Sequence, residues 1–294
     1  MSYDLYFCQR APTNLHFDQV VEWSRQYPDF RKDGDSQLIY ENQNTGVYFI
    51  LEWSEQAQGE DPGIPTGVHP TGLSLSLNYA RPTFFALEAM PIAEALASHL
   101  GLTTFDPQGG PTDGMQSSEQ LIRSWSKSNQ QVTESLAKDS DTFFRLSPET
   151  AFQFWTYMHG DYPRLSRELE KPDVYVPRMF IIRNKNSKRA ETAIAWTIGV
   201  HLVIPRCDWI VVVFPKSFWR RETEMFFFRS ESVLKAMAPY LKEFDQRCDL
   251  QVLPPENRSR ADRILKGLEG GQGKAGFETL SPDRCVDVLT AQNE

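Results

Sequence analysis

Residues Leu73-Ser-Leu-Ser-Leu-Asn-Tyr79 alternate strictly between apolar and polar side chains. A period of two residues is typical of a β-strand that buries one face. Two earlier runs, Gln37–Glu41 and 46–53, are rich in aromatic and β-branched residues, and the link Asn42-Gln-Asn-Thr-Gly46 between them favours a hairpin. The N-terminal part of the chain is therefore predicted to contain a β-sheet.

Helical patterns lie on both sides of these strands. A short strand is expected at residues 4–8, and apolar side chains within 17–23 then recur at helical spacing. Residues 84–100 have the composition of a helix, in which Pro91 either introduces a kink or begins a second helix, and Gly101 is a suitable stop. The order strand, helix, three strands, helix predicts a small mixed sheet with helices.

The segment Asp106-Pro-Gln-Gly-Gly-Pro-Thr-Asp-Gly114 is the strongest break in these patterns, because Gly and Pro disfavour both helix and strand. We therefore expect an acidic α+β domain at residues 1–105, a linker at 106–117 and a second α+β domain at 118–294. The length of 294 residues suits one large domain or two ordinary ones.

The second predicted domain begins with helices, one of which starts at Ser147-Pro148-Glu149. Five short apolar runs follow between residues 174 and 228, and their spacing predicts an antiparallel β-meander. Further helices are expected at 230–244 and 259–268. The predicted fold class is therefore α+β, with a small N-terminal mixed sheet and helices, then a helical segment, then a C-terminal antiparallel β-meander with helices.

Charge is distributed unevenly along the chain. The 31 Lys and Arg against 39 Asp and Glu give a net charge of −8, yet residues 1–105 contain five basic and thirteen acidic side chains. Residues 174–229 contain ten basic and four acidic ones. An asymmetry of this kind can steer the association of two proteins, and the negative total argues against a nucleic acid as the partner.

Several classes of protein are disfavoured by the sequence. No apolar run approaches the roughly 20 residues that span a bilayer, and the first residues do not resemble a signal peptide. The four cysteines, Cys8, Cys207, Cys248 and Cys285, are widely spaced and form no Cys-x-x-Cys pair. Free thiols are typical of the cytosol, so we expect a cytoplasmic protein and no membrane partner.

The motifs of common enzymes are also missing. There is no Gly-x-Ser-x-Gly elbow, no phosphate-binding Gly-x-x-x-x-Gly-Lys-[Ser/Thr] motif and no metal-ligand spacing of histidines. The Gly-rich run 267–274 follows a predicted helix and is expected to be a flexible loop. We therefore predict no catalytic residue, no cofactor and no metal.

Four blocks of the sequence resemble a family of poorly characterised bacterial proteins: Met1-Ser-Tyr-Asp-Leu-Tyr-Phe7, Tyr40-Glu-Asn-Gln-Asn-Thr-Gly-Val-Tyr-Phe49, Leu77-Asn-Tyr-Ala-Arg-Pro-Thr-Phe-Phe-Ala-Leu-Glu88 and Pro205-Arg-Cys-Asp-Trp-Ile210. Some members of that family look like immunity proteins of bacterial toxin systems. The resemblance implies a cytosolic bacterial protein and makes a binding role more plausible than catalysis. It transfers no site residues, because these blocks contain no catalytic motif of the family.

The expected function is that of a non-catalytic cytosolic binding protein, such as an immunity protein that neutralises a bacterial toxin by stoichiometric binding. The partner is then a protein, such as a cognate toxin, and the oligomeric state stays open. The candidate contacts are acidic loop residues and one group of aromatic and basic residues. They are Asp29, Asp33, Asp35, Glu52, Glu55, Glu60, Asp61, Trp219, Arg220 and Arg221.

Two other functions fit the same sequence. One is an enzyme of unfamiliar type with its site between the two domains, for which Arg183, His159, His201 and Asp208 are the first residues to inspect. The other is a structural component that associates with itself through the aromatic-rich meander. A cluster such as Lys216–Arg221 is compatible with a protein interface, with nucleic-acid binding or with a loop anchored by its aromatic residues.

Overall fold

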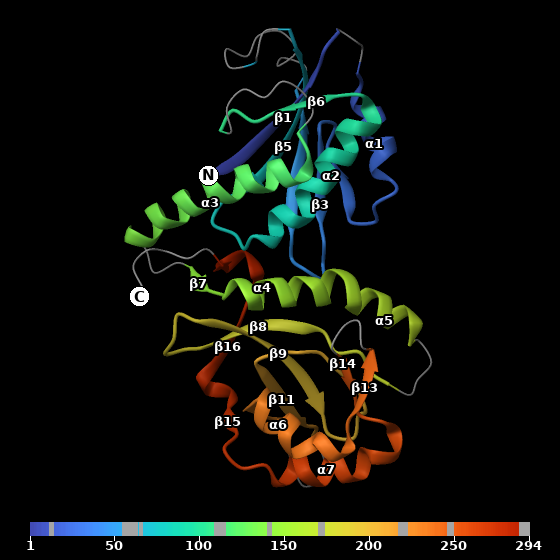
Figure 1. Ribbon diagram of the computed structural model, residues 1–294, viewed down its shortest axis with the longest axis vertical. Coiled ribbons are helices and arrows are strands. Elements are labelled where there is room, and N and C mark those ends of the chain that lie inside the picture. Colours follow the sequence, from blue (N-terminus) through green and yellow to red (C-terminus); the bar gives the residue numbers. More distant parts are fainter. Residues whose placement is uncertain are drawn as a thin grey trace. The chain divides into compact units, whose positions relative to one another are not determined.

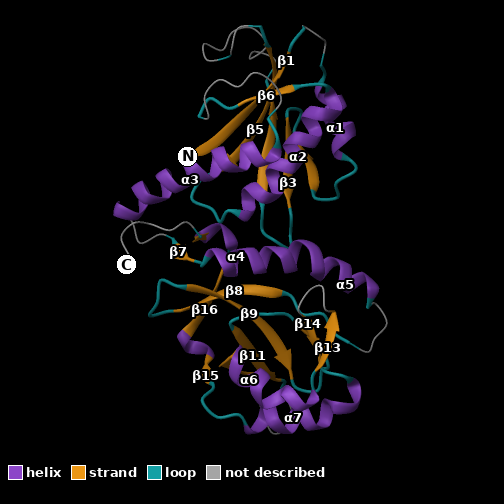
Figure 2. Ribbon diagram, in the orientation of Figure 1, coloured by secondary structure: helices purple, strands orange, loops and turns teal. Residues whose placement is uncertain are grey.

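The computed structural model describes residues 1–11, 15–54, 64, 67–108, 116–139, 143–169, 174–216, 223–245 and 250–287. The chain forms two compact units. Unit 1 comprises Met1–Phe143 and Val286–Glu294, and unit 2 comprises Phe144–Cys285. Both units combine helices with β-sheet, so the predicted α+β class is confirmed (Figures 1 and 2). In the described ranges, no helix is both long enough and apolar enough to cross a membrane.

Unit 1 is built on a six-stranded sheet with the order β2-β3-β4-β5-β1-β6. Its strands are β1 (Ser2–Gln9), β2 (Phe30–Asp33), β3 (Gln37–Glu41), β4 (Tyr48–Trp53), β5 (His69–Asn78) and β6 (Thr103–Phe105). The predicted β3–β4 hairpin and the alternating strand β5 are present. All neighbours in the sheet pair in the antiparallel sense, whereas a mixed sheet was expected, because β2 to β5 form a continuous meander and β1 then runs opposite to β5.

The helices of unit 1 pack on one face of this sheet. They are α1 (Phe17–Ser24), α2 (Phe84–Leu100) and α3 (Ser118–Asp139). The face beneath them contains Leu38, Leu51 and Leu75, which pair across neighbouring strands and are at most 1% exposed. Figure 1 shows α2 crossing the strands on this side. α2 is a single helix that includes Pro91, and Gly101 ends it in the left-handed conformation (φ 66°), as the sequence predicted.

A strained turn joins β5 to α2. Ala80 has φ 56°, a left-handed conformation that is uncommon for any residue except Gly. The amide side chain of Asn129, on α3, holds this turn: its Oδ1 accepts from the Ala80 N–H at 2.7 Å, and its Nδ2 donates to the Arg81 carbonyl at 2.9 Å. The turn and α3 therefore stabilise each other.

The position of α3 explains why the two units divide near residue 143 and not within 106–117, where the linker was predicted. Leu121 and Trp125 of α3 are completely buried, and the Trp125 ring stacks on Tyr79 with centroids 6.3 Å apart. This packing places α3 in unit 1. The predicted boundary at the Gly- and Pro-rich segment thus differs from the observed division, because the helix after that segment returns to the first core.

Unit 2 has a six-stranded sheet with the order β15-β12-β11-β9-β8-β16 and a three-stranded sheet with the order β10-β14-β13. The strands of the larger sheet are β8 (Met179–Asn184), β9 (Ala190–Thr197), β11 (Trp209–Phe214), β12 (Glu224–Arg229), β15 (Gln272–Gly273) and β16 (Phe277–Leu280). The smaller sheet contains β10 (Val203–Ile204), β13 (Lys242–Asp245) and β14 (Leu250–Val252), and the short strands β7 (Phe144–Arg145) and β17 (Cys285–Val286) complete the set.

The predicted meander is present with one change. β8 pairs with β9 and β11 pairs with β12 in the antiparallel sense, but β9 and β11 are parallel. The reason is that the chain leaves the larger sheet between them, where Val203 and Ile204 form β10 and pair with β14. β11 therefore starts from the same end of the sheet as β9.

The helices of unit 2 are α4 (Pro148–Trp155), a π-helix (Thr156–Asp161), α5 (Tyr162–Glu168), α6 (Ser230–Met237) and α7 (Arg258–Gly267). Short 3₁₀-helices lie at Ala238–Tyr240, Pro255–Asn257, Lys274–Gly276 and Pro282–Arg284. The predicted start of α4 is confirmed, because the Ser147 side chain accepts from the Thr150 N–H at 3.1 Å. The helix predicted over 230–244 is shorter in the structure: α6 ends at Met237, because Pro239 lies in the 3₁₀ turn that follows.

The Gly-rich segment after α7, expected to be a flexible loop, contains a short paired strand. Its strand β15 pairs with β12, and Gly271 lies directly against the Phe228 ring. A Cβ atom at residue 271 would lie 2.5 Å from the Phe228 Cζ atom, which is far closer than van der Waals contact. The neighbouring Gly273 has no atom within 4 Å of its own Cβ position.

We therefore predict that Gly271→Ala destabilises unit 2 by about 1–3 kcal/mol, because the added methyl group overpacks the Phe228 ring. Gly273→Ala, two residues further along the same segment, is the matched control and should change stability by less than about 0.5 kcal/mol. Urea unfolding followed by tryptophan fluorescence measures both. Equal midpoints for the two variants would contradict this packing.

Candidate functional site

The side of the unit 1 sheet opposite its helices is exposed or half-buried along β1 to β5. Pairing register and strand alternation place Ser2, Tyr6, Glu41, Tyr48 and Asn78 on this side, together with nine further side chains. These nine are Asp4, Arg31, Asp33, Gln37, Ile39, Ile50, Glu52, Ser74 and Ser76, and we call them the outer face. The strand residues between them point to the buried side, beneath α1, α2 and α3. The outer face is thus a broad surface of regular geometry.

The structure brings together two of the predicted contact residues on this face. Asp33 pairs with Gln37 across β2 and β3, and Gln37 pairs with Glu52 across β3 and β4. The Gln37 amide donates to a Glu52 carboxylate oxygen, and Arg31 lies 3.9 Å from the Asp33 carboxylate. With Asp4 and the adjacent Glu41, this side of the sheet has four carboxylates and one guanidinium, so it is negatively charged.

The other predicted contacts lie beside this face or outside the described residues. Asp29 precedes β2, and its carbonyl accepts from the Glu41 N–H at 2.9 Å. Asp35 is exposed in the turn between β2 and β3, next to Gly34 with φ 63°. Glu55, Glu60, Asp61, Trp219, Arg220 and Arg221 lie outside the described residues.

Sequence reasoning missed the middle of the outer face. Ile39, Ile50, Ser74 and Ser76 were not predicted as contacts, although the alternation of residues 73–79 already indicated which serines face away from the core. β2 was missed as well, because its four residues, Phe-Arg-Lys-Asp, are mostly charged. In the sequence, the aromatic residue Phe30 is the one sign of β2. In the structure, its ring packs on Tyr40 in the next strand, with centroids 5.2 Å apart.

Buried carboxylates in unit 1 are engaged in internal hydrogen bonds. Glu88 on α2 accepts from the Tyr40 hydroxyl at 2.7 Å, the Asn42 amide at 2.6 Å and the Thr45 hydroxyl at 3.0 Å. Asp106 accepts from the Tyr3 hydroxyl at 2.8 Å and from the Ser124 hydroxyl. Burial, followed by the neighbouring carboxylates, raises the pKa of both Tyr40 and Tyr3. These groups hold helices on the sheet.

Asp287 has a comparable structural role near the C-terminus. Its carboxylate accepts from the Thr83 N–H at 2.9 Å and from the Thr83 hydroxyl at 3.0 Å, at the start of α2. Burial raises the pKa of Asp287, and the hydrogen bonds from Thr83 act in the opposite direction. The segment at residues 286–287 is thereby attached to unit 1.

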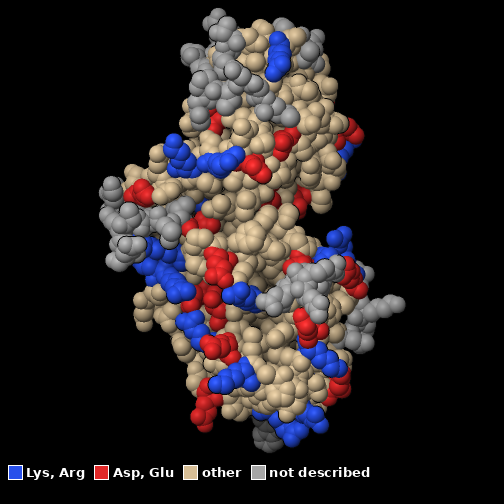
Figure 3. Space-filling model, in the orientation of Figure 1, with Lys and Arg blue, Asp and Glu red and all other residues tan. Residues whose placement is uncertain are grey.

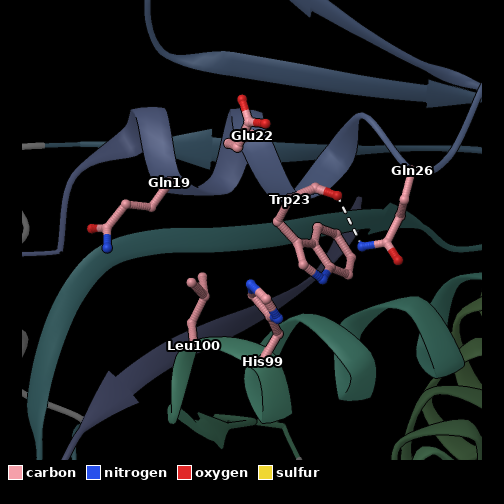
Figure 4. A pocket seen from close by; sticks show the side chains of 6 residues that line it. All are labelled: Gln19, Glu22, Trp23, Gln26, His99 and Leu100. Atoms are coloured by element: carbon pink, nitrogen blue, oxygen red, sulfur yellow. Dashed lines mark hydrogen bonds between the residues drawn. The ribbon is translucent and has the colours of Figure 1, made fainter.

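A shallow groove lies on the helical side of unit 1 (Figure 4). It has a volume of about 430 Å³ and lies between α1 and the end of α2. Its lining residues are Gln19, Glu22, Trp23, Gln26, His99 and Leu100. The Gln26 amide donates to the Trp23 carbonyl at 2.9 Å, and the Glu22 carboxylate pairs with Arg25. The groove combines an indole and a leucine with two amides, a carboxylate and an imidazole.

Comparison of the chain with protein-family models, with curated proteins and with solved structures found no match. The resemblance to immunity proteins therefore stays a prediction.

The residues considered for an enzyme site have different partners within unit 2. Asp208 accepts from the Thr192 N–H at 2.8 Å and from its hydroxyl at 2.9 Å, while Arg183 donates to Glu278 at 2.7 Å. His159 is exposed and stacks on Trp155 with centroids 5.2 Å apart. His201 has a buried Nδ1 atom without a hydrogen-bond partner. Within the described ranges, no group of three or more His, Cys, Asp and Glu is arranged to hold a metal ion.

Cys207 is the half-buried cysteine of the described residues. Its thiol donates to the Trp209 carbonyl at 3.3 Å and lies 3.5 Å from the Ser230 hydroxyl. Burial raises the pKa of Cys207 to about 12, and the nearby carboxylate of Asp208 acts in the same direction. Because the thiolate is the reactive form, this environment disfavours a nucleophilic role.

We predict that iodoacetamide at pH 8 modifies Cys207 roughly tenfold more slowly, or slower still, in the native protein than in urea. The raised pKa lowers the thiolate fraction, while the higher intrinsic nucleophilicity of such a thiolate offsets only part of the loss. Peptide mass spectrometry of timed samples measures the rate at this cysteine. Faster labelling in the native state would show an activated thiol and would reopen the enzyme interpretation.

Proposed function

We propose that this protein is a non-catalytic binding protein whose unit 1 binds a basic protein partner through the outer face. The observation that supports this most directly is the position of Asp33 and Glu52. They lie in one register row, on the side of the sheet away from the helices. Their carboxylates are exposed to solvent and accessible to a partner, whereas Glu88 and Asp106 are buried and accept hydrogen bonds from within unit 1.

The charge of the two units agrees with this assignment. Unit 1 has eight basic and 21 acidic residues, and unit 2 has 23 basic and 18 acidic residues. The net charge of −8 is therefore the sum of a strongly acidic unit and a mildly basic one. The negative electrostatic potential of unit 1 attracts a basic partner. Such attraction raises the rate of association by roughly 10- to 1,000-fold when the charge is focused on one face.

The composition of the outer face also suits a protein interface. Ile39 and Ile50 pair with each other across β3 and β4 and are half-buried, so they offer apolar contact near the middle of the face. Asp33 and Arg31 lie on the edge strand β2, Glu52 lies in the row of side chains next to the isoleucines, and Ser74 and Ser76 add short hydroxyl side chains. An apolar centre with a polar border is the usual anatomy of a specific interface.

The more specific proposal is an immunity protein that neutralises a bacterial toxin in the cytoplasm by stoichiometric binding. It is supported by the four sequence blocks quoted above and by the acidity of unit 1. A toxin that acts on nucleic acid needs a basic active site, because its substrate is a polyanion. An acidic face that covers such a site would exclude the substrate.

The test uses the purified products of the genes adjacent to this one, because immunity and toxin genes form operons. We predict a 1:1 complex with a basic product, whose association rate falls at least fivefold in the double variant Asp33→Asn, Glu52→Gln and falls with added salt. Stopped-flow fluorescence measures the rate, and survival of cells that express the product measures neutralisation.

The matched control is Asp18→Asn, Glu119→Gln, which removes two exposed carboxylates from α1 and α3 in the same unit. It changes the net charge equally but leaves the outer face intact, so it should slow association by less than about twofold. Equal effects of the two double variants would place the interface elsewhere. The absence of any complex with these basic products would remove the toxin proposal.

A further inference from the structure

A second charged surface lies in unit 2 and is centred on Phe144. The Phe144 ring is only 3% exposed, and three cations surround it. The Arg183 guanidinium carbon lies 4.2 Å from the ring centroid, that of Arg284 lies 5.0 Å from it, and the Lys188 Nζ atom lies 5.7 Å from it. Each contact is a cation–π interaction, so the ring holds the three positive groups close to one another.

Further cations lie on the same segments of the chain. Lys185 and Arg189 are exposed in the turn between β8 and β9, and the Arg145 N–H donates to the Lys188 carbonyl at 2.9 Å. We call Arg145, Arg183, Lys185, Lys188, Arg189 and Arg284 the cationic cluster. In the region where Figure 1 labels β7, β8 and β16, Figure 3 shows several Lys and Arg side chains with Asp and Glu side chains beside them.

The segments that form the cluster contain few carboxylates. Residues 144–145, 183–189 and 277–284 contain the six cations but only Glu278 and Asp283 as acids. Glu278 accepts from Arg183 at 2.7 Å, and this hydrogen bond lowers the pKa of Glu278. The charges of Arg284 and Lys185 also lower the pKa of Glu278, so one carboxylate is shared by several cations and the cluster as a whole stays positive.

We propose that the cationic cluster binds the phosphate backbone of a nucleic acid. A duplex has one phosphate per roughly 1.7 Å of its axis, a charge density that suits several closely spaced cations. An acidic protein is a poorer match, because a protein interface normally needs an apolar anchor and Phe144 is covered by its cations. The exposed cations Lys185, Arg189 and Arg284 would contact phosphates, and no base is recognised.

This inference does not depend on the proposed function of unit 1. The negative charge of the whole chain argued against a nucleic acid, but unit 2 alone has five more basic than acidic residues. The two charged surfaces lie on different units and attract partners of opposite sign. Failure of one proposal therefore leaves the other unchanged.

The experiment titrates the full-length protein into a fluorescein-labelled 20-base-pair DNA duplex of arbitrary sequence and follows fluorescence anisotropy between 25 and 200 mM NaCl. We expect binding that weakens linearly with log salt concentration. The double variant Lys185→Gln, Arg189→Gln should reduce the magnitude of that slope by about two, one for each lost phosphate contact. Arg284→Gln should reduce it by about one.

The matched control is Lys235→Gln, Lys266→Gln, which removes two exposed lysines from α6 and α7 of the same unit and leaves the slope unchanged. Circular dichroism checks that all variants are folded. If the Lys185→Gln, Arg189→Gln variant is unfolded, the single variant Arg284→Gln takes its place in the test. No binding at 25 mM NaCl, or equal losses in the two double variants, would overturn the proposal. Competition by poly-glutamate as strong as that by unlabelled duplex would also overturn the proposal, because the cluster would then be a surface that binds acidic proteins.

Discussion

The arrangement of unit 1 depends on one buried carboxylate. Glu88 lies on α2 and accepts hydrogen bonds from Tyr40 in β3 and from Asn42 and Thr45 in the turn that follows β3. A buried charge is costly unless it is fully hydrogen-bonded, so these three donors must stay on the helical side of the hairpin. Strand alternation then directs Gln37 and Ile39 to the opposite side. A slip of one residue would exchange the two faces and bury the acidic side chains.

The same geometry gives the carboxylates of unit 1 two different roles. Glu88 and Asp106 are buried and serve as hydrogen-bond acceptors for the fold, whereas Asp33 and Glu52 remain exposed. Unit 2 shows the reverse pattern, because its exposed charges near Phe144 are mainly positive. A single net charge for the chain hides this separation. The charge of each surface, and not the net charge of the whole chain, determines which partner that surface attracts.

Local sequence patterns predicted the elements that depend on local interactions. The β3–β4 hairpin, the alternating strand β5, the Ser147 cap and the Gly101 stop are all determined by neighbouring residues. What the sequence could not reveal depends on distant partners. The inner face of α3 includes the polar residues Asn129 and Thr133, so nothing in its pattern showed that it packs on the first core. The parallel pairing of β9 and β11 depends on β14, nearly 50 residues away. The two exposed acids on the outer face were found from composition, whereas the face itself became visible only through strand register.

The left-handed backbone at Ala80 links α3 to the turn between β5 and α2. Asn129 supplies the acceptor for the Ala80 N–H, and no helix or strand ladder can replace it, because this residue lies between β5 and α2. Detachment of α3 would leave that amide unpaired in a conformation that costs energy to maintain. Solvent exchange of this single proton therefore reports how often α3 leaves the core, and α3 is cooperative with the start of α2 rather than an appendage that moves independently.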